Sequence, residues 1–158
     1  MRQQAPPIHR IPFTKEGYQK LIKERDQLLL DRPDAVDHLK KAREMGDLSE
    51  NGYYKAARAR LSGIDANLRR LTKLIRLGKI VDTSTTTDAV SFGSTVTLSV
   101  GSLTQMFTVV GGFESNPAEK IISHISPLGK ALMNKRVGDT VTVHAPKGSI
   151  TYTILHIQ

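Results

Sequence analysis

The sequence of 158 residues contains no cysteine and no tryptophan, and aromatic residues make up only 5% of it. Without cysteine the protein can form neither disulfides nor thiolate metal sites. No apolar run reaches the roughly 18 residues of a membrane-spanning helix, and the opening stretch MRQQAPPIHR lacks the apolar core of a secretory signal. We therefore expect a globular, cytoplasmic protein of one or two small domains that does not contact a membrane.

Basic residues outnumber acidic residues only in the first half of the chain. Residues 1–79 hold 18 lysines and arginines against 10 acids, whereas residues 80–158 hold five of each. All of the net charge of +8 therefore lies in the first half. One interpretation is an ordinary exposed helical surface; the other is a partner that contains nucleic acid.

Heptad spacing predicts a helical hairpin in that half. Apolar or nearly apolar residues recur at alternating intervals of three and four at Tyr54, Ala57, Leu61, Ile64, Leu68, Leu71 and Ile75. An earlier segment carries Leu21, Leu28, Ala35, Leu39 and Ala42. Such a pattern is typical of an antiparallel coiled coil.

A single register matches the two segments. Pairing positions whose numbers sum to 96 sets Ala42 opposite Tyr54 and Leu39 opposite Ala57, so that small residues face larger ones. The remaining pairs are Ala35 with Leu61, Leu28 with Leu68, and Leu21 with Ile75. The chain then folds back at Leu48.

Capping and breaking residues set the expected helix bounds. Thr14 is a candidate N-cap, and glycines at 46 and 78 are natural stops. About 31 residues at ~1.5 Å each give an arm of roughly 45 Å. Pro33 predicts an irregularity half-way along, shared with Ser62 and Gly63 on the second helix.

The pattern changes to strands after residue 79. Alternating residues predict strands over 90–100, 105–110, 120–125, 140–144 and 150–157, and a short helix over 127–134. The predicted fold class is α+β: a long antiparallel coiled-coil hairpin over residues 1–79, then a small domain with a mainly antiparallel sheet over residues 80–158.

Two carboxylates, Asp47 and Glu50, lie at the predicted tip of the hairpin. Their spacing fits a capping box, in which each side chain satisfies a backbone amide. It also fits a pair that shares a divalent cation such as Mg²⁺ with a partner, because two ligands are too few to hold the ion alone. The two roles are compatible. Basic residues follow the tip along both helices: Lys40, Lys41, Arg43, Lys55, Arg58 and Arg60.

Two long motifs resemble the GreA/GreB family of bacterial transcript cleavage factors. Residues 42–57 read AREMGDLSENGYYKAA, which is similar to the family's tip signature, and residues 125–139 read ISPLGKALMNKRVGD, which is similar to its carboxy-terminal signature. The segments 78–82 and 92–96 also fit, so the resemblance covers nearly the whole chain after residue 10. Asn134 departs from the pattern by replacing a glycine, although asparagine tolerates the same left-handed backbone.

The resemblance implies a fold and a mechanism. The second domain would be FKBP-like (similar to FK506-binding proteins) and would dock on bacterial RNA polymerase. The coiled coil of one monomer would enter the secondary channel, where Asp47 and Glu50 help to place the Mg²⁺ ion supplied at the polymerase active site. The intrinsic nuclease of the polymerase would then trim the 3′ end of the nascent, backtracked RNA. The chain itself would not be an enzyme.

Other residues acquire expected roles from the same resemblance. Ser49 and Asn51 would support the tip, and the six basic residues would face the RNA. Ser126, Pro127 and Leu128 would contact the polymerase. A local role competes here, because Ser126 and Pro127 also suit the start of a helix, and Leu128 and Leu132 suit a core.

Four alternatives stay open on the sequence. Acidic relatives block the channel without stimulating cleavage, although only two tip acids occur here. An independent nuclease would need more ligands than the scattered histidines supply. A prolyl isomerase would need an aromatic pocket, and this half has only Phe92, Phe107, Phe113 and Tyr152. The basic arm leans towards GreB over GreA, whereas tip and length do not decide.

Overall fold

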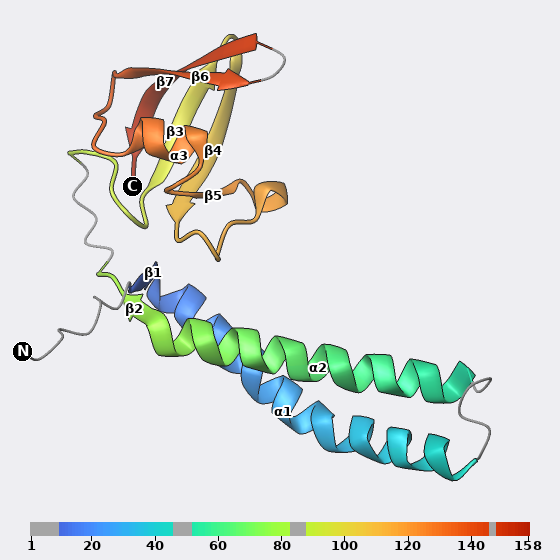
Figure 1. Ribbon diagram of the computed structural model, residues 1–158. Helices are drawn as coiled ribbons and strands as arrows, with labels where there is room; N and C mark the ends of the chain where they lie inside the picture. Colours follow the sequence, from blue (N-terminus) through green and yellow to red (C-terminus); the bar gives the residue numbers. More distant parts are fainter. Residues whose placement is uncertain (1–9, 46–51, 83–87, 146–147) are drawn as a thin grey trace, which may run out of the picture. The chain divides into compact units, whose positions relative to one another are not determined.

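The computed structural model describes residues 10–45, 52–82, 88–145 and 148–158. The chain forms a long helical hairpin followed by a curled antiparallel sheet with a short helix, as the sequence predicts (Figure 1). Its contacts divide it into two compact units. The first contains residues 18–78, and the second contains residues 10–17 and 79–158. The domain boundary expected between residues 79 and 80 stays a prediction.

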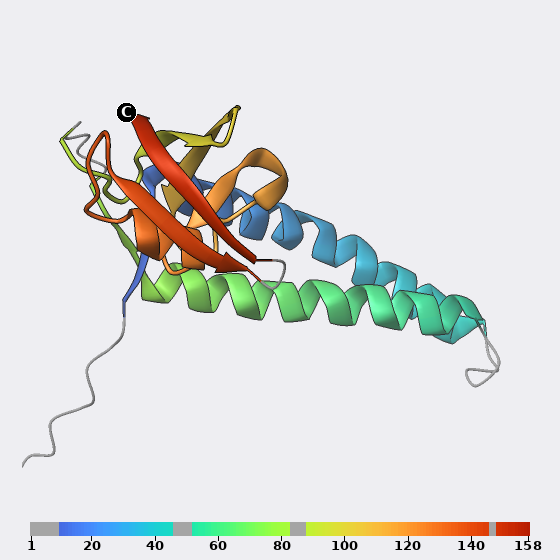
Figure 2. The same ribbon diagram turned by 90° about the horizontal axis from the view of Figure 1, so that it is seen from above.

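The hairpin consists of α1 (Lys15–Glu44) and α2 (Gly52–Leu77), which lie side by side and antiparallel (Figure 2). Thr14 begins α1 as predicted, because its Oγ1 accepts a hydrogen bond from the Gly17 amide at 3.0 Å. The seam buries the predicted residues Leu21, Ala35, Ala42, Ala57, Ile64 and Leu71. Leu74, which the heptad pattern omitted, is also buried.

Ion pairs between the helices confirm the register. Arg32 pairs with Asp65, and the residue numbers sum to 97, while Asp34 with Arg60 and Glu24 with Arg70 each sum to 94. These sums lie within two residues of 96, the value derived from the apolar residues. The side chains of these pairs remain partly exposed, so the pairs lie beside the buried seam and not in it.

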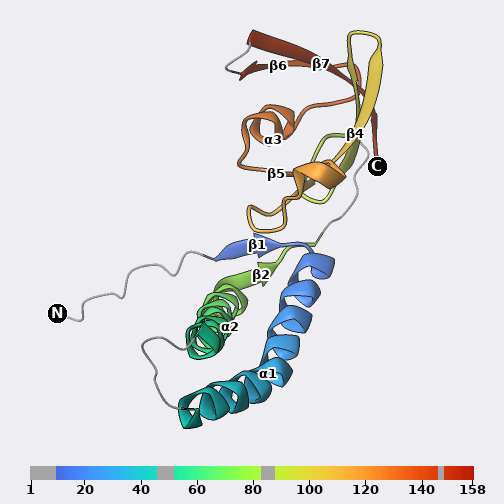
Figure 3. The ribbon, with the colours of Figure 1, turned by 90° about the vertical axis from the view of Figure 1, so that its right-hand side faces the viewer.

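Pro33 does not divide α1 into two helices, and the irregularity expected at Pro33, Ser62 and Gly63 stays a prediction. The helix is continuous from Lys15 to Glu44, and α2 is continuous through Gly63. A proline removes one backbone hydrogen bond, and packing of the seam on either side preserves the helix. Figure 3 shows that α1 curves along its length.

The second unit is built on a five-stranded sheet. Its strands are β3 (Thr95–Val100), β4 (Leu103–Val110), β5 (Ile121–Ser123), β6 (Thr140–Ala145) and β7 (Gly148–Ile157). Their order is β5-β4-β3-β7-β6, and all neighbours are antiparallel except β4 with β5. A short 3-10 helix, η1 (Pro117–Glu119), precedes β5.

Two strands are shorter than the sequence suggests. The strand predicted from residue 90 starts at Thr95, because Val90 bonds instead to the backbone of Asn134 and Lys135, and a turn follows at Ser91–Ser94. The strand predicted over 120–125 covers Ile121–Ser123 only, because Lys120 before it has a left-handed backbone with φ of 59° and a turn from the Ser123 carbonyl to the Ser126 amide follows it. Alternating apolar residues do not reveal such turns.

The helix α3 (Pro127–Leu132) lies inside the curl of the sheet (Figure 3). Leu132 is fully buried in the core with Val96, Leu98, Val109 and Ile154. Just after α3, Asn134 has a φ of 63°, the left-handed conformation expected where the family pattern has glycine.

Residues 10–17 belong to the second unit. β1 (Ile11–Phe13) pairs with β2 (Gly78–Ile80), a two-stranded sheet that the sequence analysis missed. Phe13 is fully buried and stacks on Phe113 with ring centroids 6.4 Å apart. Among the described residues, no helix has both the length and the apolar character needed to span a membrane.

Candidate functional site

The predicted tip residues Asp47, Ser49, Glu50 and Asn51 lie outside the described residues. The helices on either side are described: α1 ends at Glu44, and α2 begins at Gly52. The two carboxylates therefore belong to the short segment that joins the far ends of the hairpin. Their capping and metal-binding roles stay predictions.

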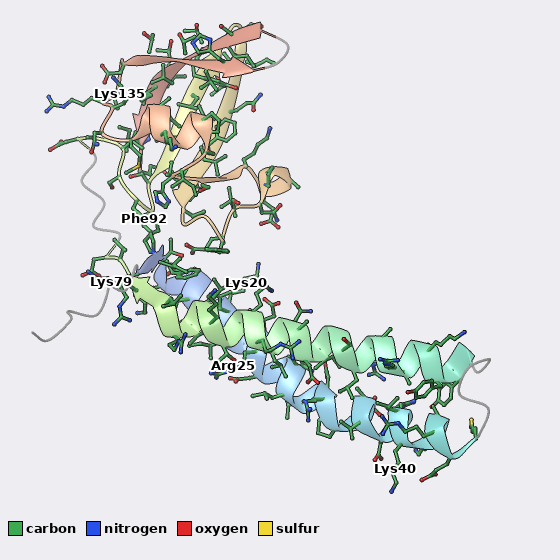
Figure 4. All side chains as sticks on the ribbon, viewed as in Figure 1. Lys20, Arg25, Lys40, Lys79, Phe92 and Lys135 are labelled. Atoms are coloured by element: carbon green, nitrogen blue, oxygen red, sulfur yellow. The ribbon has the colours of Figure 1, made fainter. Side chains whose placement is uncertain are left out.

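The six basic residues predicted to face RNA are all exposed on the helices next to this segment. Lys40, Lys41 and Arg43 lie in the last two turns of α1, and Figure 4 shows Lys40 near the far end of the hairpin. Lys55, Arg58 and Arg60 lie in the first three turns of α2. Both helices thus carry cations at the end of the hairpin whose connecting segment contains Asp47 and Glu50 in the sequence.

The cations do not share one surface. Arg60 is held by Asp34, with Nη1 and Oδ2 2.9 Å apart. Among ion pairs between described residues, none involves the other five. Lys40 and Arg43 line an open hollow of about 590 Å³ between the helices, together with Val36, Leu39, Glu44 and Leu61. Arg58 is one turn before Leu61 and so lies on the same side of α2.

One ion pair on the arm shifts the pKa of each of its two side chains. Arg32 Nε donates to Asp65 Oδ1 at 2.8 Å. The hydrogen bond from Arg32 stabilises the carboxylate and lowers the pKa of Asp65, and the same bond raises the pKa of Arg32. This pair joins the middle of the two helices on one flank of the seam.

Sequence reasoning missed a polar cluster on the arm. His38 contacts Tyr53 across the two helices, with Nδ1 2.8 Å from the hydroxyl. The register does not reveal this contact, because 38 and 53 sum to 91, five short of 96 and so more than one helical turn from the predicted pairing. Asp34 and His38 are also four residues apart, which places them on one face of a helix.

The predicted docking residues form the start of α3. Ser126 is the N-cap: its Oγ accepts from the Gly129 amide at 3.1 Å and donates to the Ser123 carbonyl at 2.6 Å. Pro127 occupies the first turn and is exposed. The local role weighed for these residues is therefore confirmed.

Leu128 and Leu132 differ in accessibility. Leu132 belongs to the core, and Leu128 is half-buried and packs against that core. Ser126, Pro127 and Leu128 remain candidates for a contact with the polymerase. Among the described residues, no group of three or more histidine, cysteine, aspartate or glutamate side chains converges on a point.

Comparisons with known proteins agree with these two units. Residues 11–80 match the family model "Transcription elongation factor, N-terminal", and residues 85–158 match "Transcription elongation factor, GreA/GreB, C-term". The chain is 41% identical over 149 residues to transcription elongation factor GreA of Nitratiruptor sp., covering 92% of this chain and 91% of that protein.

Further similar proteins span comparable lengths. GreA of Neorickettsia sennetsu is 38% identical over 155 residues, covering 96% of this chain and 98% of that protein. The crystal structure of GreA factor homolog 1 (Gfh1) of Thermus thermophilus is 25% identical, with a TM-score of 0.45 and coverage of 94% of this chain and 99% of that one. Both curated relatives carry the GreA name, and they do not support the lean towards GreB.

Proposed function

Because this chain belongs to the GreA/GreB family of transcription elongation factors, we propose that it rescues arrested transcription by stimulating RNA cleavage in RNA polymerase. The second unit docks on the polymerase through the start of α3, and the hairpin enters the secondary channel. The nuclease activity belongs to the polymerase, and this chain supplies groups that assist it.

The distribution of charge along the hairpin carries this proposal. Two carboxylates, Asp47 and Glu50, lie in the segment joining two helices of 30 and 26 residues, and exposed cations follow on both helices. At ~1.5 Å per residue these helices form an arm of about 40 Å, long enough to bring the carboxylates into a deep channel. A helix cap alone requires no such arm.

Carboxylate oxygens suit a hard divalent cation, and Mg²⁺ bound at the polymerase active site would polarise the phosphodiester and activate water. Asp47 and Glu50 would complete a ligand set that the polymerase begins. Two carboxylates alone are too few to hold the ion. Ser49 and Asn51 would support the two acids. The exposed Lys40, Arg43 and Arg58 would attract the phosphates of the displaced RNA.

The test uses a backtracked elongation complex with end-labelled RNA, Mg²⁺ and the cognate polymerase. Wild-type protein is expected to shorten the transcript rapidly. Asp47→Asn and Glu50→Gln keep the side-chain shapes, and each is expected to slow shortening at least tenfold without weakening binding to the polymerase. Asp37→Asn, which neutralises an exposed acid on α1, is the matched control.

Two results would overturn the proposal. Wild-type protein that binds and slows the polymerase without shortening RNA would be a channel-blocking inhibitor. Equal loss of binding and cleavage in Asp47→Asn would show that the acid contributes to docking and not to the reaction.

A further inference from the structure

The five-stranded sheet has two edges, and they differ in protection. At the β5 edge, Asn116 pairs with Ile121 by two backbone hydrogen bonds of 2.9 and 3.0 Å. β5 is also only three residues long and follows Lys120, and short strands and lysines are both common means of protecting an edge. The other edge is β6, which among the described residues pairs only with β7.

The edge at β6 lacks the usual protection. Its six residues contain no proline, aspartate, glutamate, lysine or arginine, and its register with β7 has no bulge. The neighbouring strands β3, β4 and β7 contain no such charged residue either, although 24% of the whole sequence is charged. A strand that joins this edge therefore extends an uncharged sheet.

The register shows which backbone groups of β6 face away from β7. Asp139, directly before the strand, accepts from the Ile154 amide at 2.9 Å, in the register that β6 and β7 keep. Because bonded and unbonded positions alternate along an antiparallel pair, every second residue of β6 turns its amide and carbonyl away from β7. These outward residues, whose side chains are all exposed, are Thr140, Thr142 and His144.

We propose that β6 pairs with β6 of a second copy of this chain, antiparallel and about a two-fold axis at Thr142. Positions whose numbers sum to 284 then face each other, so Thr142 meets its own copy and Thr140 meets His144. All three outward residues become bonded, which gives about six hydrogen bonds between the copies. On the other face of the sheet, Val141 meets Val143.

Charge and side-chain chemistry favour a second copy as the occupant of this edge. Residues 80–158 hold five basic and five acidic residues, so two such segments approach without net repulsion. The facing side chains are hydroxyls and imidazoles on one face of the sheet and valines on the other, so the edge complements itself.

The pairing concerns the free protein and goes beyond the proposed function, in which one monomer enters the polymerase. A six-residue edge buries less than a standard interface of roughly 1,600 Å². We therefore expect a weak dimer, with a dissociation constant on the order of 100 µM.

Sedimentation velocity of the full chain from about 5 to about 500 µM tests the pairing. The wild type is expected to shift from one chain towards two as the concentration rises. Thr142→Lys is expected to stay a monomer, because two ammonium groups would meet at the axis. Thr142→Glu should behave alike, and an equal mixture of the two variants is expected to pair again, since opposite charges then meet.

Thr151→Lys is the matched control. Thr151 lies opposite Thr142 on β7, is exposed, and has its hydroxyl 3.2 Å from that of Thr142. Both lysine variants therefore lose the same contact and add the same charge. Position 151 would lie about 14 Å from its copy, beyond the screening length of about 8 Å at physiological salt. Thr151→Lys is expected to dimerise within about threefold of the wild type.

Hydrogen exchange gives an independent readout. The amides of Thr140, Thr142 and His144 are expected to exchange several-fold more slowly at the highest concentration than at the lowest. The amides of Val141 and Val143, which bond to β7 in the monomer, should not change.

Three results would overturn the inference. The first is a wild type that stays one chain at every concentration. The second is equal association of Thr142→Lys and Thr151→Lys, which would place any contact elsewhere. The third is a mixture of Thr142→Lys and Thr142→Glu that does not pair. A monomeric wild type whose binding to the polymerase is weakened by Thr142→Lys would show instead that the edge accepts a strand of the polymerase.

Discussion

Arg32 on α1 and Asp65 on α2 meet across the hairpin, with Nε and Oδ1 2.8 Å apart. The two residues are 33 positions apart in sequence, and they are brought together only when the helices pack in one register. A shift of one helix by a single turn, about 5.4 Å, would separate them. The pair therefore reports the register of the hairpin independently of its apolar seam.

Acid should remove the stability that the Arg32–Asp65 pair gives to the folded hairpin. The pKa of Asp65 is lowered in the folded chain by the hydrogen bond from Arg32. This stabilisation is therefore complete above the unfolded pKa of about 4 and disappears as the pH falls through the lower folded pKa. Asp65→Asn is expected to be less stable than the wild type at pH 7 and equally stable in strong acid.

Urea unfolding followed by helical circular dichroism at both pH values measures this difference. Arg32→Gln is expected to abolish the same pH-dependent gap, and combining the two substitutions should add nothing further. An equal gap between wild type and Asp65→Asn at every pH would contradict the assignment.

Gly129 should tolerate no side chain. A Cβ placed there would lie 2.0 Å from the Ser123 carbonyl oxygen, and backbone cannot yield as a flexible side chain can. Gly129→Ala is expected to lower the free energy of unfolding by about 2–3 kcal/mol and to displace the docking candidates Ser126 and Pro127. Denaturant unfolding measures the first effect, and polymerase binding measures the second.

Gly63 provides the opposite case. It lies in the interior of α2 with open space around the position of a Cβ. Gly63→Ala is therefore expected to stabilise the hairpin by about 0.5–1 kcal/mol. A loss of stability there would show that the helix needs a glycine for a reason other than space.

A charge in the seam should unfold the arm. Leu71 is fully buried between the helices, so Leu71→Asp places a carboxylate where it has neither water nor a partner. The expected loss exceeds about 4 kcal/mol. Leu30→Asp is the matched control, because Leu30 is 74% exposed and its replacement should change stability by less than about 0.5 kcal/mol. Retention of full helicity by Leu71→Asp would contradict the observed packing.

Glu114 should hold the start of α1. Its carboxylate accepts from the Thr14 amide at 3.2 Å, from the Thr14 hydroxyl and from the Gly111 amide at 3.0 Å. A negative charge is also favoured at a helix N-terminus. Glu114→Ala is expected to accelerate hydrogen exchange of the Thr14 and Gly111 amides at least tenfold. Glu119→Ala, at an exposed acid on η1, should leave both rates unchanged.

The sequence by itself determined the hairpin. Its seam, the register near a sum of 96, the Thr14 cap and the helical start at Ser126 all depend on local spacing or on the chemistry of one residue. Helical periodicity repeats every few residues, so neighbouring positions are sufficient to reveal it. The order of strands, in contrast, includes β5 beside β4 in parallel, and alternation along one strand says nothing about its neighbour.

Only the tertiary structure decided the contacts between distant positions. The contact between Tyr53 and His38, the pairing of β1 with β2 and the bond from Thr14 to Glu114 join residues 15 to 100 positions apart. Pro33 also shows that sequence-local preference is not decisive, because α1 continues through a proline that local preference disfavours. Spacing determines which face of an element a residue occupies, and packing determines which partner that residue meets.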